Sequence, residues 1–215
     1  MCVRGGLAPR ASVTGPVMGA LRVPMTGDVV VTGIRFWPDT GAAILGVPAE
    51  TLRGAWIPAV ELLGSEAAAM AFAAAAAAED PARTAAVFDD WLASRVRAAP
   101  PIDDVVRRAV RAIVAARGDL SIAGLARDAG IGIRQLQRRF RRVVGLSPKE
   151  YARIRRLRST LEAALRGEAC WSAVAYELGY ADQSHLIHEV GDLTGLTPAA
   201  VRKRLGLIEH VDVRP

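Results

Sequence analysis

The sequence predicts a mainly α-helical protein in which two helix-turn-helix units are joined by a long helix and preceded by a small partial β-sheet with further helices. Three observations lead to this prediction. Apolar residues recur at helical spacing from Gly41 onward. Glycines end several helical segments only a few residues before the next segment begins. Residues 125–148 also align with residues 174–198, which indicates an internal repeat.

The composition is typical of a globular chain that is neither exported nor inserted in a membrane. Of 215 residues, 51% are hydrophobic and 23% are charged. The N-terminus lacks the apolar run of about 7 to 15 residues that a signal peptide needs. The longest apolar run, 67–78, is shorter than the roughly 20 residues that cross a bilayer. Cys2 and Cys170 give neither a disulfide framework nor a zinc-site spacing, so we expect a cytoplasmic protein without a cofactor.

The net charge of +6 belongs to the second half of the chain. Residues 1–99 carry 8 Lys/Arg against 9 Asp/Glu, and residues 100–215 carry 20 against 13, so the halves stand at −1 and +7. Ten Lys/Arg and one acid, Glu150, lie within 133–158. This density is typical of a nucleic-acid-binding surface, although charge alone leaves open a solvated helix face without a ligand.

The first 99 residues predict a few strands followed by helices. The β-branched and aromatic stretch 28–37, DVVVTGIRFW, predicts a strand that ends at the turn signal 38–41. About 40 residues precede the helices, which leaves room for about three or four strands. Helices are expected near the following stretches: 42–46, 48–54, 58–64, 65–78 and 81–98.

The helix predicted over 81–98 carries an apolar stripe that we expect in the core. Its members recur at helical spacing: Thr84, Val87, Phe88, Trp91, Leu92 and Val96. The stretch 98–103, AAPPID, reads as a linker because a residue before proline is pushed out of the helical region. We therefore divide the chain between 99 and 100.

Beyond the linker, helix signals come at short intervals. Residues 103–117 open with acids and end at Arg117 and Gly118, which suits the helix dipole and a glycine C-cap. Ser121 is placed to cap the next helix, which Gly130 ends. A further helix begins at Ile133, so the two are joined by the short glycine-containing turn of a helix-turn-helix.

The internal repeat makes this unit recur once. The matching pairs are Ala126 with Ala175 and Gly130 with Gly179 at an offset of 49, then Leu136 with Leu186, Gly145 with Gly195 and Pro148 with Pro198 at an offset of 50. One inserted residue in the turn explains the change of offset. A basic helix over 148–165 joins the copies, and four of its residues are expected to pack: Tyr151, Ile154, Leu161 and Leu165.

The runs LARDAG…LQRRF…GLSPKEY…RL and VAYELGYADQSHLIHEV…TGLTPAAVR resemble the AraC/XylS family of bacterial transcription regulators over about 103–204. The resemblance implies a DNA-binding domain over 100–206, a tail over 207–215, and two recognition helices that read adjacent major grooves of double-stranded DNA. Residues 1–99 look like the end of a regulatory domain, so we expect the chain to be truncated at its start. RNA polymerase and a second copy of the chain are further candidate partners, and a small-molecule effector stays open.

The first recognition helix separates an apolar face from a polar one. The apolar face is expected to hold Ile133, Leu136, Phe140 and Val143. Arginine and glutamine suit bidentate contact with guanine and adenine edges, and an arginine farther along the helix reaches phosphate. The expected DNA contacts are Arg134, Gln137, Arg138, Arg141 and Arg142, with the first three as leading base readers. Arg139 stands where the family usually has an apolar residue.

The second recognition helix follows from the repeat. Ser184 takes the place of Arg134, Ile187 that of Gln137, and His188 that of Arg138. The second, weaker set of DNA contacts is therefore Gln183, Ser184, Ile187 and His188.

The same helix raises a metal-site alternative. His185 and His188 are three residues apart and Glu189 follows, so all three could face one ion. No further ligand cluster accompanies them, and the helix-turn-helix accounts for the spacing, so we expect no metal. By resemblance, His185 has a structural role or lies at the DNA surface.

The second unit departs from the first in its chemistry. Residues 171–195 contain no Lys or Arg and four acids: Glu177, Asp182, Glu189 and Asp192. Because phosphate repels acids, we expect weak DNA binding here. Val190 replaces a usual phenylalanine, and Gly191 costs ~1 kcal/mol within a helix. The alternative function is therefore a shortened regulator that acts mainly through protein-protein pairing.

The sequence contains no glycine-rich phosphate loop, no nucleophile elbow and no plausible acid pair, so we expect that the protein is not an enzyme.

Overall fold

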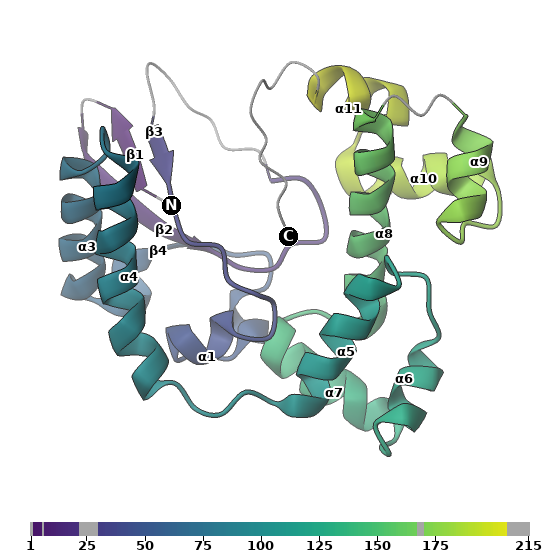
Figure 1. The fold of residues 1–215 in the computed structure, drawn as a ribbon, viewed down its shortest axis with the longest axis horizontal. Coiled ribbons are helices and arrows are strands. Elements are labelled where there is room, and N and C mark those ends of the chain that lie inside the picture. The colour runs from purple at the N-terminus through teal and green to yellow at the C-terminus, as the bar shows by residue number, and fades with distance from the viewer. Residues whose placement is uncertain (1, 6, 22–29, 167–169, 206–215) are drawn as a thin grey trace. The chain divides into compact units, whose positions relative to one another are not determined.

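The computed structural model describes residues 2–5, 7–21, 30–166 and 170–205, so the predicted tail lies outside the described residues. The fold is mainly helical, as predicted (Figure 1). The described chain forms two compact units. Unit 1 contains the residues up to 17 together with 30–110 and 134–147, and unit 2 contains 18–21, 111–133 and 148–205. The boundary between 99 and 100 remains a prediction.

Unit 1 contains a small antiparallel sheet. Its described strands are β1 (Cys2–Gly5), β2 (Leu7–Thr14), β3 (Val30–Thr32) and β4 (Trp56–Pro58), in the order β3-β1-β2-β4. Three of these strands precede residue 41, which agrees with the number expected there, whereas β4 lies among the helices, where no strand was predicted. The strand predicted over 28–37 is too long: its first two residues lie outside the described residues, and 33–37 have no strand pairing. The chain turns where expected, since the Thr40 N–H donates to the Trp37 carbonyl at 3.0 Å.

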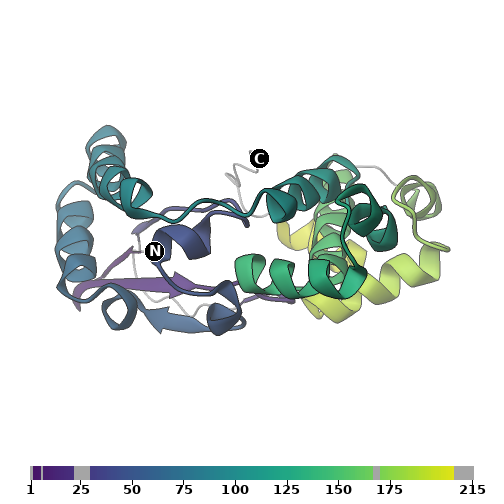
Figure 2. The same ribbon diagram turned by 90° about the horizontal axis from the view of Figure 1, so that it is seen from below.

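The helices of the N-terminal part lie close to their predicted positions. They are α1 (Gly41–Leu45), a 3₁₀ helix (Ala49–Leu52), α2 (Ala59–Leu63), α3 (Ser65–Ala76) and α4 (Pro81–Ala98). Asp80 caps α4 by accepting from the N–H groups of Ala82 at 2.9 Å and Arg83 at 3.2 Å. α3 packs on β1 and β2, and α4 lies beside α3 (Figures 1 and 2).

The apolar stripe of α4 is confirmed except at its end. Thr84, Phe88 and Trp91 are buried, and Val87 and Leu92 are half-buried. Val96 was wrongly assigned to the core, because it is 56% exposed. Arg95 already pairs with Glu66 in the first turn of α3 at 2.6 Å, so little of α3 remains to cover the following residue.

Seven helices follow the linker in the described chain. They are α5 (Asp104–Ala115), α6 (Ile122–Asp128), α7 (Ile133–Val144), α8 (Pro148–Leu165), α9 (Trp171–Glu177), α10 (Gln183–Thr194) and α11 (Pro198–Leu205). Burial recurs on α5 and α8 at an offset of 50: Ala109 with Ser159, Val110 with Thr160, and Ile113 with Ala163. The repeat is therefore larger than the sequence showed, with α5–α6–α7 and α8–α9–α10 as its two copies.

Unit 2 has its own core, to which α8 contributes small residues. The core consists of Ala163, Val174, Ala175, Leu178, Tyr180, Leu186, Val190 and Val201. Of the α8 residues expected to pack, Tyr151 is buried and Ile154 and Leu161 are half-buried. Leu165 was wrongly included, because it is 45% exposed. The buried residues of α8 beyond Tyr151 are small apart from Pro148: Ala152, Ser159, Thr160, Ala163 and Ala164.

Candidate DNA interface

The turn between α6 and α7 has the geometry that the sequence predicted. The Ser121 side chain caps α6 by accepting from the Gly124 N–H at 3.1 Å. Gly130 has a left-handed φ of 66°, and the following Ile131 N–H donates to the Ala126 carbonyl at 3.0 Å. A glycine at this position ends a helix without the steric cost that a side chain would bring. α7 then begins at Ile133, as predicted.

The turn between α9 and α10 repeats this geometry. Gly179 has a φ of 70°, and the Tyr180 N–H donates to the Ala175 carbonyl at 2.9 Å. Asp182 caps α10 by accepting from the His185 N–H at 2.8 Å. Both turns therefore use a left-handed glycine, with equivalent hydrogen bonds 49 residues apart.

The two recognition helices also end in the same way. Gly145 and Gly195 have φ values of 80° and 70°, and each N–H donates at 2.8 Å to the carbonyl four residues earlier. α7 and α10 consequently have the same length, 12 residues. The chain builds two equivalent scaffolds that differ in the side chains they display.

Burial decides which face of each helix is available to DNA. Leu136 and Phe140 on α7 are fully buried, and so are Leu186 and Val190 on α10. The predicted apolar face of α7 needs one correction: Ile133 is 44% exposed, whereas Val144 is buried. Ile133 is the first residue of the helix, where a side chain has no preceding turn to pack over.

The residues predicted to contact DNA lie on accessible parts of α7. Arg134, Arg138, Arg141 and Arg142 are exposed, and Gln137 is half-buried. The side chains of these five residues share no hydrogen bond or ion pair with another described residue. Four cations without an internal partner on one helix give a positive surface that a phosphate backbone would attract.

The predicted DNA contacts on α10 are exposed, and they carry no charge when His188 is neutral. Gln183, Ser184, Ile187 and His188 are all exposed on α10. The His188 side chain is 80% exposed, and its Nε2 lies 3.7 Å from a carboxylate oxygen of Asp192. This surface offers hydrogen bonding and apolar contact rather than a strong positive field.

A family model described as a helix-turn-helix domain matches residues 125–204. Residues 125–204 are an AraC-type helix-turn-helix domain. A domain of this type implies a DNA-binding transcription regulator. No described helix combines the length and apolar character needed to cross a bilayer.

Two solved structures are similar to the chain. One is the C-terminal domain of AraT, a response regulator from Geobacillus stearothermophilus, with 22% identity and a TM-score of 0.46; the match covers 52% of this chain and 94% of that one. The other is a probable AraC family transcriptional regulator from Rhodopseudomonas palustris CGA009, with 25% identity and a TM-score of 0.43; the match covers 47% and 97%. No curated protein matches the chain.

Within the AraC-type domain, His185 has a structural place. Its Nδ1 accepts from the Ala181 N–H at 3.2 Å, and its ring meets the Tyr180 ring edge-on with centroids 5.4 Å apart. One ring nitrogen is thus already used to hold the turn before α10. Among the described residues, no group of three or more His, Cys, Asp and Glu side chains could hold a metal ion.

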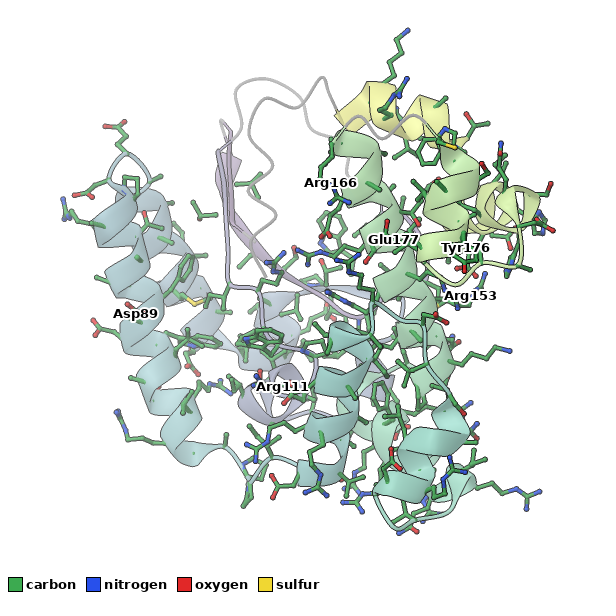
Figure 3. All side chains as sticks on the ribbon, turned by 45° about the vertical axis from the view of Figure 1, so that its right-hand side comes forward. Asp89, Arg111, Arg153, Arg166, Tyr176 and Glu177 are labelled. Carbon is green, nitrogen blue, oxygen red and sulfur yellow. The ribbon has the colours of Figure 1, made fainter. Side chains whose placement is uncertain are left out.

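The acids of the second helix-turn-helix, residues 171–195, do not form the repelling surface that their number suggested. Glu189 is only 5% exposed, and its Oε2 accepts from Arg153 Nε at 3.0 Å. Glu177 pairs with Arg117 at 2.8 Å, and Arg153 also lies 3.7 Å from Asp192. Figure 3 shows Arg153 on α8 and Glu177 on α9. Arginines outside 171–195 therefore neutralise much of the charge within it.

The sequence did not reveal the role of Arg139. This residue is half-buried and forms a bidentate bridge to Asp103, with N–O distances of 2.8 and 2.7 Å. Asp103 also accepts from the backbone N–H groups of Val105 and Val106 at 3.1 Å, which caps α5. Burial would raise the pKa of Asp103, but the hydrogen bonds from Arg139 and from these N–H groups outweigh it and lower the pKa. Arg139 thus joins α7 to the start of α5.

Proposed function

We propose that the protein recognises a specific sequence in double-stranded DNA by placing α7 and α10 in adjacent major grooves, within the cytoplasm. Residues 100–206 would act as the DNA-binding domain, and residues 1–99 as part of a regulatory region. The single observation that supports this most is a set of four α7 arginines whose side chains are exposed and have no partner among the described residues: Arg134, Arg138, Arg141 and Arg142. Cations without internal partners remain free to neutralise phosphate or to read guanine.

The roles of the α7 side chains follow from their positions. Arg134, Gln137 and Arg138 lie in the first two turns, where side chains of a recognition helix meet base edges. Arg141 and Arg142 lie in the last turn and are assigned to phosphate. On α10, Gln183, Ser184, Ile187 and His188 are assigned to the second half of the site. RNA polymerase and a second copy of the chain remain candidate partners.

The alternative, a shortened regulator that acts mainly through protein-protein pairing, rested on the acidity of the second unit. Glu189 is buried and three of the four acids are paired with arginine, so these acids give that alternative little support. DNA binding by both helix-turn-helix units is therefore the function we favour.

The deciding experiment measures binding of the full chain to genomic fragments at two salt concentrations. We expect retention of a subset of fragments, with an affinity that falls as salt rises, because each phosphate contact releases counterions. Absence of salt-sensitive retention of any fragment would reject the proposal in favour of the protein-protein alternative.

A second measurement asks whether α10 reaches the groove. His188 occupies the repeat position of Arg138, so His188→Arg should tighten binding and steepen the log-log salt slope by about 0.9 if the new cation meets a phosphate. The control is Glu162→Gln on α8, which also makes the charge more positive by one. Equal effects of both variants would show that only net charge is sensed, and no effect would leave α7 as the only reader.

A further inference from the structure

Both repeats contain a salt bridge at the same position but with reversed polarity. In the first repeat, Asp103 at the start of α5 pairs with Arg139 on α7. In the second, Arg153 on α8 pairs with Glu189 on α10 at 3.0 Å. Each bridge spans 36 residues, and the corresponding partners are 50 residues apart, which is the offset of the repeat. The acid lies on the first helix in one copy and on the recognition helix in the other.

We propose that these two bridges position each recognition helix on the first helix of its own repeat, and that their opposite polarity makes the two recognition helices non-interchangeable. Arg139 and Glu189 are therefore positioning residues that need not touch DNA. The consequence for DNA binding rests on the proposed function, whereas the pairing itself does not.

The place of the bridge on the recognition helix explains how it acts. Arg139 and Glu189 each directly precede a fully buried residue of their helix, Phe140 or Val190. A helix held only by buried apolar side chains can still rotate slightly about its axis. A charged neighbour with a fixed partner on a second helix restricts that rotation, which sets the direction of the exposed residues one turn earlier.

The second bridge is the more buried of the two. The Glu189 side chain is 6% exposed, and Arg156 Nε lies 3.9 Å from its second oxygen. A carboxylate removed from water stays ionised only when cations or hydrogen bonds replace its hydration. Glu189 therefore depends strongly on Arg153, and loss of that partner should disturb α10 more than loss of an exposed ion pair would.

Reversed polarity matters because the two copies are otherwise alike. Leu136 and Leu186, and Phe140 and Val190, are buried at matching positions, so apolar packing alone distinguishes the copies weakly. If α10 met α5, Glu189 would face Asp103, and if α7 met α8, Arg139 would face Arg153. Both exchanged pairs bring like charges together, and repulsion between wrong partners is an established source of specificity.

The test reverses the second bridge in the full chain. We expect Glu189→Arg, which copies the residue type of the first repeat, and Arg153→Glu each to lower the thermal midpoint of unfolding. Each should also weaken binding to a selected DNA fragment at least tenfold and shorten the footprint from one end only. The double variant, Glu189→Arg with Arg153→Glu, should restore the footprint length and recover part of the lost affinity and thermal midpoint. Recovery is partial because Arg156 and Asp192 stay close to the exchanged charges. Glu162→Arg is the matched control for Glu189→Arg, because it makes the same charge change at a more exposed residue, on α8. It should leave the footprint length unchanged.

The outcomes separate this inference from the proposed function. A parent protein without any footprint would reject the proposed function, and the thermal midpoints would then decide the inference alone. Single variants that leave the midpoint unchanged, or a double variant that stays as unstable as the singles, would overturn it. A footprint that shortens equally with Glu162→Arg would also overturn it, because charge alone would then explain the effect.

Discussion

The two recognition helices share a backbone and differ in almost everything that faces solvent. α7 and α10 follow equivalent left-handed glycines, have equal lengths and bury residues at matching positions. α7 carries five arginines, of which only Arg139 has a side-chain partner among the described residues. α10 carries no arginine, and its acids are directed to partners in unit 2 or to its own cap. The scaffold is repeated, while the exposed surface is not.

This difference shows that the charge of a segment is a poor guide to the charge of its functional face. Counting residues 171–195 gives four acids and no base, which suggests repulsion of DNA. Glu189 is buried against Arg153, however, and the exposed polar face begins with Gln183 and Ser184. The comparison therefore predicts a strong first reader and a neutral second reader, rather than one reader and one repelled helix.

The largest expected effect concerns the cores beneath the two helices. Phe140→Ala should lower the free energy of unfolding by about 3 to 5 kcal/mol, because it removes a fully buried aromatic ring. Val190→Ala at the matching position should cost roughly 2 kcal/mol, since fewer buried methyl groups are lost. Urea denaturation of both variants measures the difference. Equal losses would contradict the view that the second core relies less on this position.

The next effect concerns base reading by the first helix. Arg138→Ala should weaken binding to the preferred sequence by roughly 1 to 3 kcal/mol and relax base choice at one position, as expected when a bidentate reader is lost. Arg142→Ala is the control, because loss of a phosphate contact weakens binding to all sequences and reduces the salt slope. Competition binding with a set of single-base variants distinguishes the two. A uniform loss for Arg138→Ala would reassign that residue to phosphate.

The sequence predicted the local parts of this structure well. The bounds of α4, the start of α7 and the bounds of α8 follow from helical spacing and from the residues at their ends. Glycines at the turns mark each change of direction because only a residue without a side chain adopts a positive φ at little cost. Such signals depend on neighbouring residues and can therefore be read along the chain.

The sequence could not predict the contacts between distant residues. Asp103 and Arg139 are 36 residues apart, and each is unremarkable in its own helix. Burial of Glu189 runs against the usual exposure of acids, so no pattern in α10 alone indicates it. The exposure of Val96 likewise depends on where α3 begins. One signal was available for the bridges: the repeat offset of 50, applied to charged residues as well as to apolar ones.

A third prediction exploits a polar pair that only the second repeat contains. Thr160 donates to the Arg156 carbonyl at 3.0 Å, so the Tyr180 hydroxyl, 3.1 Å away, is the donor to Thr160. The equivalent positions in the first repeat are Val110 and Ile131, which have no hydroxyl groups. Tyr180→Phe should cost about 0.5 to 1.5 kcal/mol of stability at neutral pH, the usual value of one hydrogen bond. Tyr176→Phe is the control, because Tyr176 is 89% exposed.

The same residue gives a pH dependence. Burial raises the pKa of Tyr180 to about 12, above the ordinary value of 10. A raised folded-state pKa means that the unfolded chain loses this proton first, so the stabilisation is complete below about pH 10 and disappears as pH rises toward about 12. Unfolding measured across this range should show a steeper loss of stability in the parent than in Tyr180→Phe. Parallel curves would show that Tyr180 ionises as readily in the folded protein.

The smallest expected effect concerns Gly191, which stands where the first repeat has Arg141. A methyl group added at Gly191 meets no heavy atom within 4 Å apart from its chain neighbours and the nearby backbone of its own helix, and the residue lies within α10. Gly191→Ala should therefore stabilise the protein by up to about 1 kcal/mol, the difference in helix propensity. Gly195→Ala at the end of the same helix is the matched control. Its added methyl group also has open space, but the φ of +70° should make that variant destabilising.

The Gly191 variant also bears on the comparison of the two readers. Alanine adds no charge and no hydrogen-bond donor, so DNA affinity should stay unchanged if Gly191 lies away from the phosphates. A loss of affinity despite higher stability would mean that the α10 backbone approaches DNA closely at this residue, where Arg141 in the first repeat would instead reach out with a side chain. Denaturation and binding measured on the same preparation separate the two effects. The glycine would then be a second solution to contact with DNA rather than a defect in the second helix.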